Sequence, residues 1–268
     1  MAVSFGPVPA EVYEQNMGRW SRRLGVPFID FMGQCNPTEI LDVGCGTGSL
    51  TFMLANHFTS ANIIGADISE ELLEHARSLR REHLSVRFVK ADASVLPFAD
   101  RSFDLTVASL VLNFVPAPKE TLREMVRVTR PRGLIASTPW DLRGGLPHVR
   151  VVLDTAAAVE ESASDYRTRF YSAPGIRPGE LVSLFEAAGI NKVEETFLTI
   201  RIEFLCFDDF WNPTAQSGLF GLYFRGLPQA RQTLIRDKVR QAFLLGDEDG
   251  HRSFAATAWA VKGLAGSL

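Results

Sequence analysis

The most constraining feature of this sequence is a short apolar strand that runs directly into a glycine-rich turn and a helix. Glu39–Val43 reads as a buried strand, residues 44–48 read Gly-Cys-Gly-Thr-Gly, and Ser49–His57 has the composition of a helix. Glycine tolerates a positive φ and lets a ligand approach the backbone closely, and the first turn of a helix offers unpaired N–H groups. The order strand, turn, helix therefore predicts a ligand site at the carboxyl end of a strand.

The same alternation of strand and helix continues from about residue 38 to residue 139. Further strands are expected at Asn62–Asp67, 86–92, Phe103–Ser109 and 134–138, and further helices after Ser69 and over Pro118–Val128. Ser69 is a suitable N-cap residue because two glutamates follow it in the first helical turn. Repeated strand–helix units of this length are typical of a mostly parallel sheet.

The pattern changes after Trp140. We expect helices at 151–161, 179–188 and 228–245, strands at 193–204 and 253–261, and an aromatic-rich segment over 207–224. Insertions of this length between strands often form a substrate pocket or a lid. The aromatic cluster itself is interpreted as ordinary core beneath a long connection. The arginines at 77, 80 and 81 and at 123, 127 and 130 are interpreted as solvated helix faces.

Composition excludes several classes of protein. A formal net charge of −3 argues against nucleic acid as the main partner, since phosphate binding needs an excess of Lys and Arg. No apolar run reaches the roughly 18 residues that span a bilayer, and residues 1–10 do not resemble a secretory signal. Three widely spaced cysteines and five histidines without metal-ligand spacing predict no metal site, no disulfide framework and a cytoplasmic location.

Candidate binding residues follow the strands in succession. In an open parallel sheet, ligands bind outside the carboxyl ends of the strands. Asp67 is placed to accept hydrogen bonds from a ribose diol, and Asp92 with the Ala93 amide is placed to contact an adenine edge. Ser109 and Leu110 would line the floor of the cleft. Each residue is weak support alone, but their shared position at strand ends favours one nucleoside site.

These residues resemble the motifs of class I S-adenosylmethionine-dependent methyltransferases. Residues 41–48 resemble the family's first motif, 65–69 its ribose-binding loop, 90–98 its adenine-contacting segment, and 103–113 with 122–133 its later motifs. The resemblance is nearest to the ubiquinone and menaquinone C-methyltransferases. One departure is Arg132, where the family more often has glycine, and this should affect the turn conformation rather than activity.

The resemblance implies a fold, a cofactor and a set of site residues. The fold would be a three-layer Rossmann-like α/β domain, with a seven-stranded mostly parallel sheet whose last strand is antiparallel and with helical lid insertions. The cofactor would be S-adenosylmethionine. Residues 13–21 resemble a leading helix that covers it, with Trp20 as a candidate contact. The implied cofactor-binding residues are Asp42, Gly44, Cys45, Gly46, Asp67, Ile68, Asp92, Ala93, Ser109, Leu110 and Trp20.

The expected organisation is one methyltransferase domain over residues 1–268. Residues 1–37 would form an N-terminal helical lid, 38–140 the cofactor-binding core, 141–180 and 207–250 the substrate or lid insertions, and 251–263 the last strand. The sequence leaves open whether the chain forms a homodimer.

The expected function is methyl transfer from S-adenosylmethionine to an unidentified small molecule by in-line displacement, leaving S-adenosylhomocysteine. No catalytic residue can be assigned, and His148 and Asp141 are candidate bases by position alone. An NAD(P)-dependent oxidoreductase on a related fold is one alternative, although it does not account for Asp92 and Ala93. A non-catalytic module that binds the cofactor or its product is another.

Overall fold

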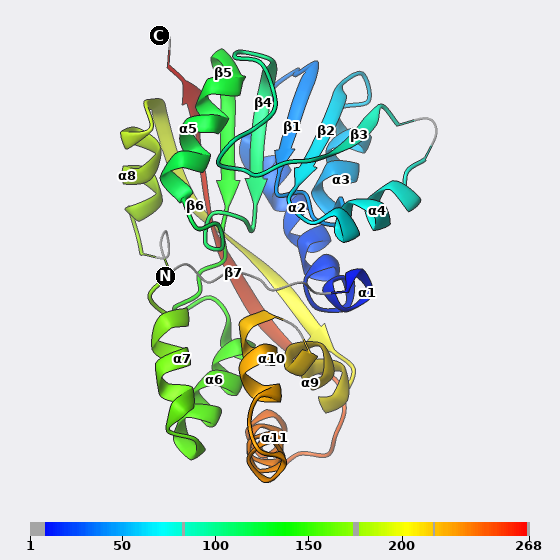
Figure 1. Cartoon of the computed structure of the whole chain (residues 1–268), viewed down its shortest axis with the longest axis vertical. Helices are drawn as coiled ribbons and strands as arrows, with labels where there is room; N and C mark the ends of the chain where they lie inside the picture. Colours follow the sequence, from blue (N-terminus) through cyan, green and yellow to red (C-terminus); the bar gives the residue numbers. More distant parts are fainter. Residues whose placement is uncertain (1–8, 82–83, 174–176, 217, 267–268) are drawn as a thin grey trace.

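A twisted seven-stranded sheet forms the centre of the molecule (Figure 1). The structure, a computed structural model, describes residues 9–81, 84–173, 177–216 and 218–266. The strand order is β3-β2-β1-β4-β5-β7-β6; β1 to β5 are mutually parallel, and β7 is antiparallel to both of its neighbours. The strands are β1 (Glu39–Val43), β2 (Asn62–Asp67), β3 (Val86–Lys90), β4 (Phe103–Ser109), β5 (Thr129–Thr138), β6 (Ile190–Phe204) and β7 (Arg252–Ala265). The expected fold class, including the antiparallel last strand, is confirmed.

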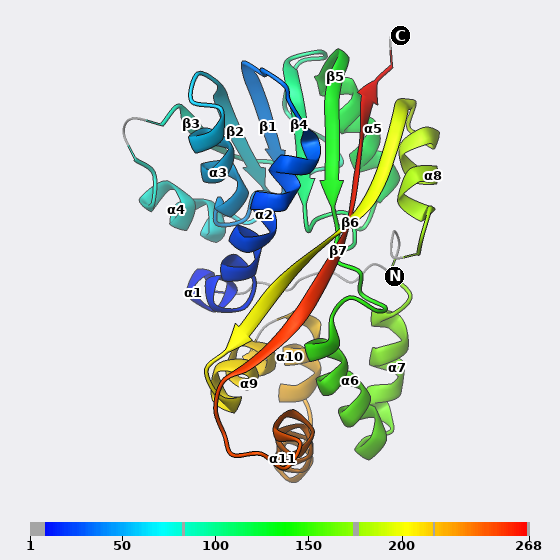
Figure 2. The same ribbon diagram turned by 180° about the vertical axis from the view of Figure 1, so that it is seen from behind.

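Helices cover both faces of the sheet. The first face carries α2 (Arg19–Met32), α3 (Ser49–His57) and α4 (Glu70–Ser78) (Figure 2). These helices pack through a core that contains Phe28, Leu54 and Leu73. The second face carries α5 (Pro118–Val128) and α8 (Glu180–Ala187), which bury Leu122 and Phe185. Ahead of α2 lie α1 (Ala10–Tyr13) and a π-helical turn, η1 (Glu14–Gly18). The sheet and the helices on its two faces therefore form three layers, with the sheet in the middle.

A third group of helices lies at the far end of the strands β6 and β7. These two strands form a ribbon that is paired from Ile190↔Ala265 to Phe204↔Arg252, whereas β5 pairs with β7 only from Leu134↔Leu264 to Ser137↔Val261. The ribbon therefore extends beyond the sheet, as both views show (Figures 1 and 2). Around its end lie α6 (Pro147–Val159), α7 (Ser162–Phe170), α9 (Phe207–Gln216), α10 (Gly218–Arg225) and α11 (Gln229–Leu244).

Local sequence explains where several elements begin. The Ser69 hydroxyl accepts a hydrogen bond from Leu72 N at 3.4 Å and caps α4, as its position predicts. Pro118 occupies the first turn of α5, where its missing N–H is not needed. Arg132 has a φ of +66°, a conformation that costs a residue with a Cβ roughly 1–2 kcal/mol. Arg132 therefore has a glycine-like backbone within β5, where the register of β5 with β4 shifts.

The structure differs from the sequence-based expectations in helices α7, α9 and α10, which were not expected, and at several strand ends. The fifth strand begins at Thr129 rather than at residue 134, and the sixth begins at Ile190 rather than at 193. The last strand continues to Ala265, and the third ends at Lys90, before Asp92. Among the described residues, no helix is long and apolar enough to cross a membrane.

Candidate functional site

A cavity of about 580 Å³ opens at the carboxyl ends of the parallel strands, and we call it the strand-end cavity. In Figure 1 the arrowheads of β1, β4 and β5 point toward this edge of the sheet and toward the third group of helices. Six of the predicted site residues line the cavity: Gly44, Asp67, Ile68, Asp92, Ala93 and Leu110. They come from four successive strand ends, so the structure brings together what the sequence placed separately.

The glycine turn that follows β1 is held close to β2. The backbone N–H groups of Gly44 and Cys45 both donate to the Ala66 carbonyl, at 2.7 and 3.0 Å. Gly44 has a φ of +70°, and a Cβ added there would lie 2.4 Å from Cγ2 of Val111. Only glycine fits at this position, because a side chain would require both a strained φ and a displaced neighbour.

Asp67 organises the turn from the end of β2. Its Oδ2 accepts a hydrogen bond from Gly46 N at 2.8 Å, and its Oδ1 accepts one from Ser69 N at 2.9 Å. Burial raises the pKa of this carboxyl group, and the backbone donors oppose that rise. A carboxylate has about four acceptor positions, so Asp67 keeps acceptor capacity for a ligand while it binds the turn.

Asp92 lies in a more solvated position, after the neighbouring strand β3. Its Oδ1 accepts hydrogen bonds from the backbone N and the hydroxyl of Ser94, at 2.8 and 2.7 Å. These two donors hold the pKa of the Asp92 carboxyl below its usual value. The floor of the cavity includes Leu110, which has a φ of +60° directly after β4. A non-glycine residue in this conformation marks local backbone strain, which is common at binding sites.

Five other predicted residues lie outside the lining of the strand-end cavity. Asp42 is buried in β1, Cys45 and Gly46 belong to the glycine turn, and Ser109 is part of β4 and pairs in register with Thr138 of β5. Trp20 is buried and lines a different cavity, described below. Trp20 therefore lines a cavity next to the one that Asp67 and Asp92 line.

Asp42 is a carboxyl group with almost no exposure, beneath the glycine turn. The Thr51 hydroxyl donates to its Oδ2 at 2.6 Å, yet burial raises its pKa to about 7. Between pH 4 and pH 7 the unfolded chain releases this proton and the folded chain retains it, so stability falls as pH rises. Between pH 5 and pH 6, the free energy of unfolding of the wild type, measured in urea, should fall by about 1.4 kcal/mol more than that of Asp42→Asn. If the two proteins change in stability equally with pH, the assignment of this proton to Asp42 is wrong.

Tyr13 lines the strand-end cavity from the N-terminal side. A Cβ added to Gly46 would lie 2.9 Å from the Tyr13 hydroxyl oxygen, so the tyrosine packs directly over the glycine turn. Burial and the nearby Asp67 carboxylate raise the pKa of the phenol. Next to it, the Glu14 carboxylate accepts a hydrogen bond from the Thr47 hydroxyl and pairs with Arg22. The N-terminal segment thus covers the turn.

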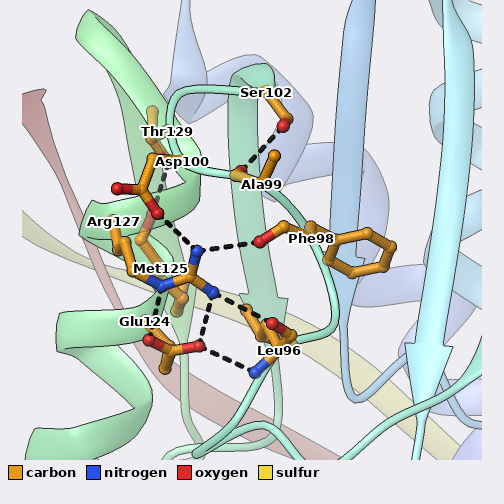
Figure 3. A network of polar contacts seen from close by, with 9 residues as sticks. All are labelled: Leu96, Phe98, Ala99, Asp100, Ser102, Glu124, Met125, Arg127 and Thr129. Atoms are coloured by element: carbon orange, nitrogen blue, oxygen red, sulfur yellow. Dashed lines mark hydrogen bonds and ion pairs between the residues drawn. The ribbon is translucent and has the colours of Figure 1, made fainter.

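The loop that follows Asp92 is fastened by Arg127, which sequence reasoning missed (Figure 3). The Arg127 guanidinium donates to the carbonyls of Leu96 and Phe98, at 2.9 and 2.8 Å, and to Asp100 at 2.7 Å. Glu124 accepts from Arg127 at 2.7 Å and from Leu96 N at 2.8 Å. The interpretation of Arg127 as a solvated residue is therefore wrong.

Two further arginines from the same interpretation also have defined partners. Arg77 donates to the Phe88 carbonyl at 3.2 Å, and Arg130 pairs with Asp104 at 2.5 Å. Arg130 lies in β5 rather than in a helix. Arg80, Arg81 and Arg123 are exposed, as expected.

A second cavity of about 120 Å³ lies between α2, the β6–β7 ribbon and the third group of helices. We call it the aromatic cavity because its lining includes Trp20, Trp140, Phe204 and Phe210. The aromatic segment is therefore core, as interpreted, but part of it also faces a cavity. Met17 and Phe114 line both cavities, so the two are adjacent.

Comparisons with known proteins agree with this geometry. A family model described as a methyltransferase domain matches residues 41–137. The demethylmenaquinone methyltransferase of Clavibacter sepedonicus is 35% identical over 173 residues, which are 61% of this chain and 70% of that protein. The demethylmenaquinone methyltransferase of Thermus thermophilus is 39% identical over 117 residues, 43% of this chain and 51% of that protein.

A solved structure shows the same fold at low identity. Haemonchus contortus phosphoethanolamine N-methyltransferase 2, in complex with phosphomonomethylethanolamine and S-adenosylhomocysteine, has a TM-score of 0.58 and 14% identity, covering 97% of this chain and 57% of that one. In several other curated relatives, the matched region spans less than half of the relative's length. From the shared motifs, the sheet order and these matches, the chain belongs to the family of S-adenosylmethionine-dependent methyltransferases.

Proposed function

We propose that the chain transfers a methyl group from S-adenosylmethionine to a small-molecule acceptor by in-line displacement. The observation that carries the proposal is that residues from four successive strand ends line one cavity. Asp67 would accept hydrogen bonds from the ribose diol, and Asp92 with the Ala93 amide would bind the adenine. The glycine turn leaves room for the amino-acid end of the cofactor. Membership of the family supports the same assignment.

The chain's own contribution to such a reaction would be positioning. When bound, the cofactor supplies an electrophilic methyl group, whose bond to sulfur breaks as the bond to the acceptor forms. Holding the reacting groups in line is worth about 7–11 kcal/mol of the barrier, and no protein nucleophile is needed. Tyr13, Met17 and Phe114 border the strand-end cavity and would exclude water from the reaction.

Three free cysteines, Cys35, Cys45 and Cys206, support the proposed cytoplasmic location.

Replacing Asp67 tests the proposal. Asp67→Asn should weaken S-adenosylmethionine binding by about 1.5–3 kcal/mol, roughly 10- to 150-fold, because charge-assisted hydrogen bonds to the ribose are lost. Titration calorimetry measures the affinity of wild type and variant for S-adenosylmethionine. The same titration with NADH tests the alternative of an oxidoreductase, which would bind NADH instead. Glu71→Gln removes the same charge from an exposed position in the first turn of α4 and should leave the affinity within twofold.

Two results would count against the proposed site. One is equal S-adenosylmethionine affinity in wild type and Asp67→Asn. The other is binding of NADH but not of S-adenosylmethionine to the wild-type chain. Formation of S-adenosylhomocysteine with an acceptor would in addition separate an enzyme from a module that only binds the cofactor.

A further inference from the structure

The aromatic cavity has a lining without charge. None of the described residues that line it is Asp, Glu, Lys or Arg. The guanidinium of Arg19 lies close to this lining, over the rings of Trp20 and Phe204, at 4.3 and 5.2 Å from their centroids. Arg19 is already paired with Asp209 at 3.0 Å. A charged ligand would therefore lose its hydration here without gaining a counter-charge.

One polar group in this lining lacks a partner. His148 lies in the first turn of α6, with its ring 5.9 Å from Phe204 and 6.3 Å from Phe254. Its Nδ1 is buried and has no hydrogen-bond partner among the described residues. Burial and the charge of Arg19 lower the pKa of the imidazole to about 3, so it is neutral at physiological pH. His148 is thus a neutral polar ring in an uncharged lining, and a ligand hydroxyl in the cavity would give the imidazole a hydrogen-bond partner.

The size and position of the cavity restrict the ligand further. Its volume of about 120 Å³ is close to that of an apolar cavity of ~150 Å³ that holds one benzene ring. Aromatic side chains offer edges and faces to a planar ring. Because Met17 and Phe114 border both cavities, a molecule in the aromatic cavity would lie next to the proposed cofactor site.

We propose that the aromatic cavity is the acceptor site and takes an uncharged molecule with one aromatic ring and one hydroxyl group, which hydrogen-bonds to the imidazole of His148. The inference rests on the proposed function, because it identifies the acceptor of that methyl transfer. A hydroxyl group can both donate and accept a hydrogen bond, so it satisfies either tautomer of the neutral imidazole. His148 acts here as a specificity-determining residue that orients the acceptor.

The test uses the full chain saturated with S-adenosylhomocysteine and four ring compounds of similar shape. Calorimetry measures 4-methylphenol, its hydrocarbon match p-xylene, and the charged 4-methylbenzoate and 4-methylbenzylammonium. We expect 4-methylphenol to bind about 5- to 30-fold more tightly than p-xylene, and the charged compounds not to bind. Equal affinity for 4-methylphenol and p-xylene, or binding of a charged compound at least as tight as that of 4-methylphenol, overturns the proposal.

Substitutions of His148 test whether this residue causes the preference for 4-methylphenol over p-xylene. His148→Phe should abolish the preference for 4-methylphenol and keep p-xylene affinity within threefold, whereas His148→Gln should keep most of the preference. His251→Phe, at an exposed position, is the matched control and should behave as wild type. A preference that survives in His148→Phe overturns the assignment, and His148→Gln provides the same test if the phenylalanine variant does not fold.

The outcomes separate this inference from the proposed function. If S-adenosylhomocysteine binds and no ring compound does, the acceptor site is wrong and the cofactor site stands. If S-adenosylhomocysteine does not bind, the proposed function fails. The same four compounds titrated into the free chain then still decide whether the aromatic cavity selects a neutral hydroxylated ring.

Discussion

Phe243→Ala is expected to lower the free energy of unfolding by about 3–5 kcal/mol, the usual cost of removing a fully buried phenylalanine ring. Phe243 lies in α11 with only 2% of its surface exposed. Its ring stacks on Phe210 at 4.7 Å with an interplanar angle of 15°, and it meets Phe207 at 5.8 Å edge-on. Truncation would leave a hole between α9, α11 and the β6–β7 ribbon.

Urea unfolding of Phe243→Ala against Leu245→Ala measures this effect. Leu245 lies two residues further along the chain, is 84% exposed, and should change stability by less than about 0.5 kcal/mol. Phe243 lines neither cavity, so the folded variant should bind S-adenosylhomocysteine within about twofold of wild type. A loss of stability below 1 kcal/mol would show that the ring is not packed as described.

Arg127→Ala is expected to cost about 2–3 kcal/mol of stability and to weaken cofactor binding several-fold. Removing the guanidinium deprives the Leu96 and Phe98 carbonyls of charged donors and leaves Glu124 without its cation. Hydrogen bonds to charged groups contribute about 1.5–3 kcal/mol each, and the partial exposure of Arg127 reduces their sum. Since the loop begins at Asp92, the adenine end of the proposed site should loosen with it.

Arg123→Ala is the matched control on the same helix. Arg123 has 67% of its side chain exposed and pairs with Glu120 at 3.5 Å, so its loss should cost less than about 0.5 kcal/mol. Thermal unfolding and titration with S-adenosylhomocysteine on both variants distinguish the two positions. Similar losses in Arg123→Ala and Arg127→Ala would mean that the loop does not depend on the network in Figure 3.

The sequence predicted the parts of the site that depend on local order along the chain. The bounds of β1, β2, β4, α3 and α5 match their expectations, because each combines a clear apolar period with a turn or cap residue. Asp67 and Asp92 face one cavity because parallel strands align their carboxyl ends. For these residues, chain order alone determines which edge of the sheet they occupy.

The rest depends on contacts between distant segments. Whether Arg127 meets solvent or a loop carbonyl depends on the path of residues 96–100, which has no periodic signal. Trp20, a candidate cofactor contact, packs edge-on against Phe204 at 5.6 Å, and this contact joins two segments far apart in the chain. A strand that leaves a sheet has the same side-chain alternation as one that stays in it. The ribbon, and with it the aromatic cavity, therefore could not be predicted.

The extended ribbon separates the helices that line the aromatic cavity from the strand ends that line the strand-end cavity. Helices α6, α7, α9, α10 and α11 are attached through the connections on either side of β6, while the strand ends that would hold adenosine belong to the first part of the chain. If the aromatic cavity binds the acceptor as proposed, substitutions in those helices would change the acceptor without altering the register of β1, β2 and β4. These helices could therefore be exchanged between related proteins as one unit, and the strand ends proposed to bind adenosine would stay unchanged.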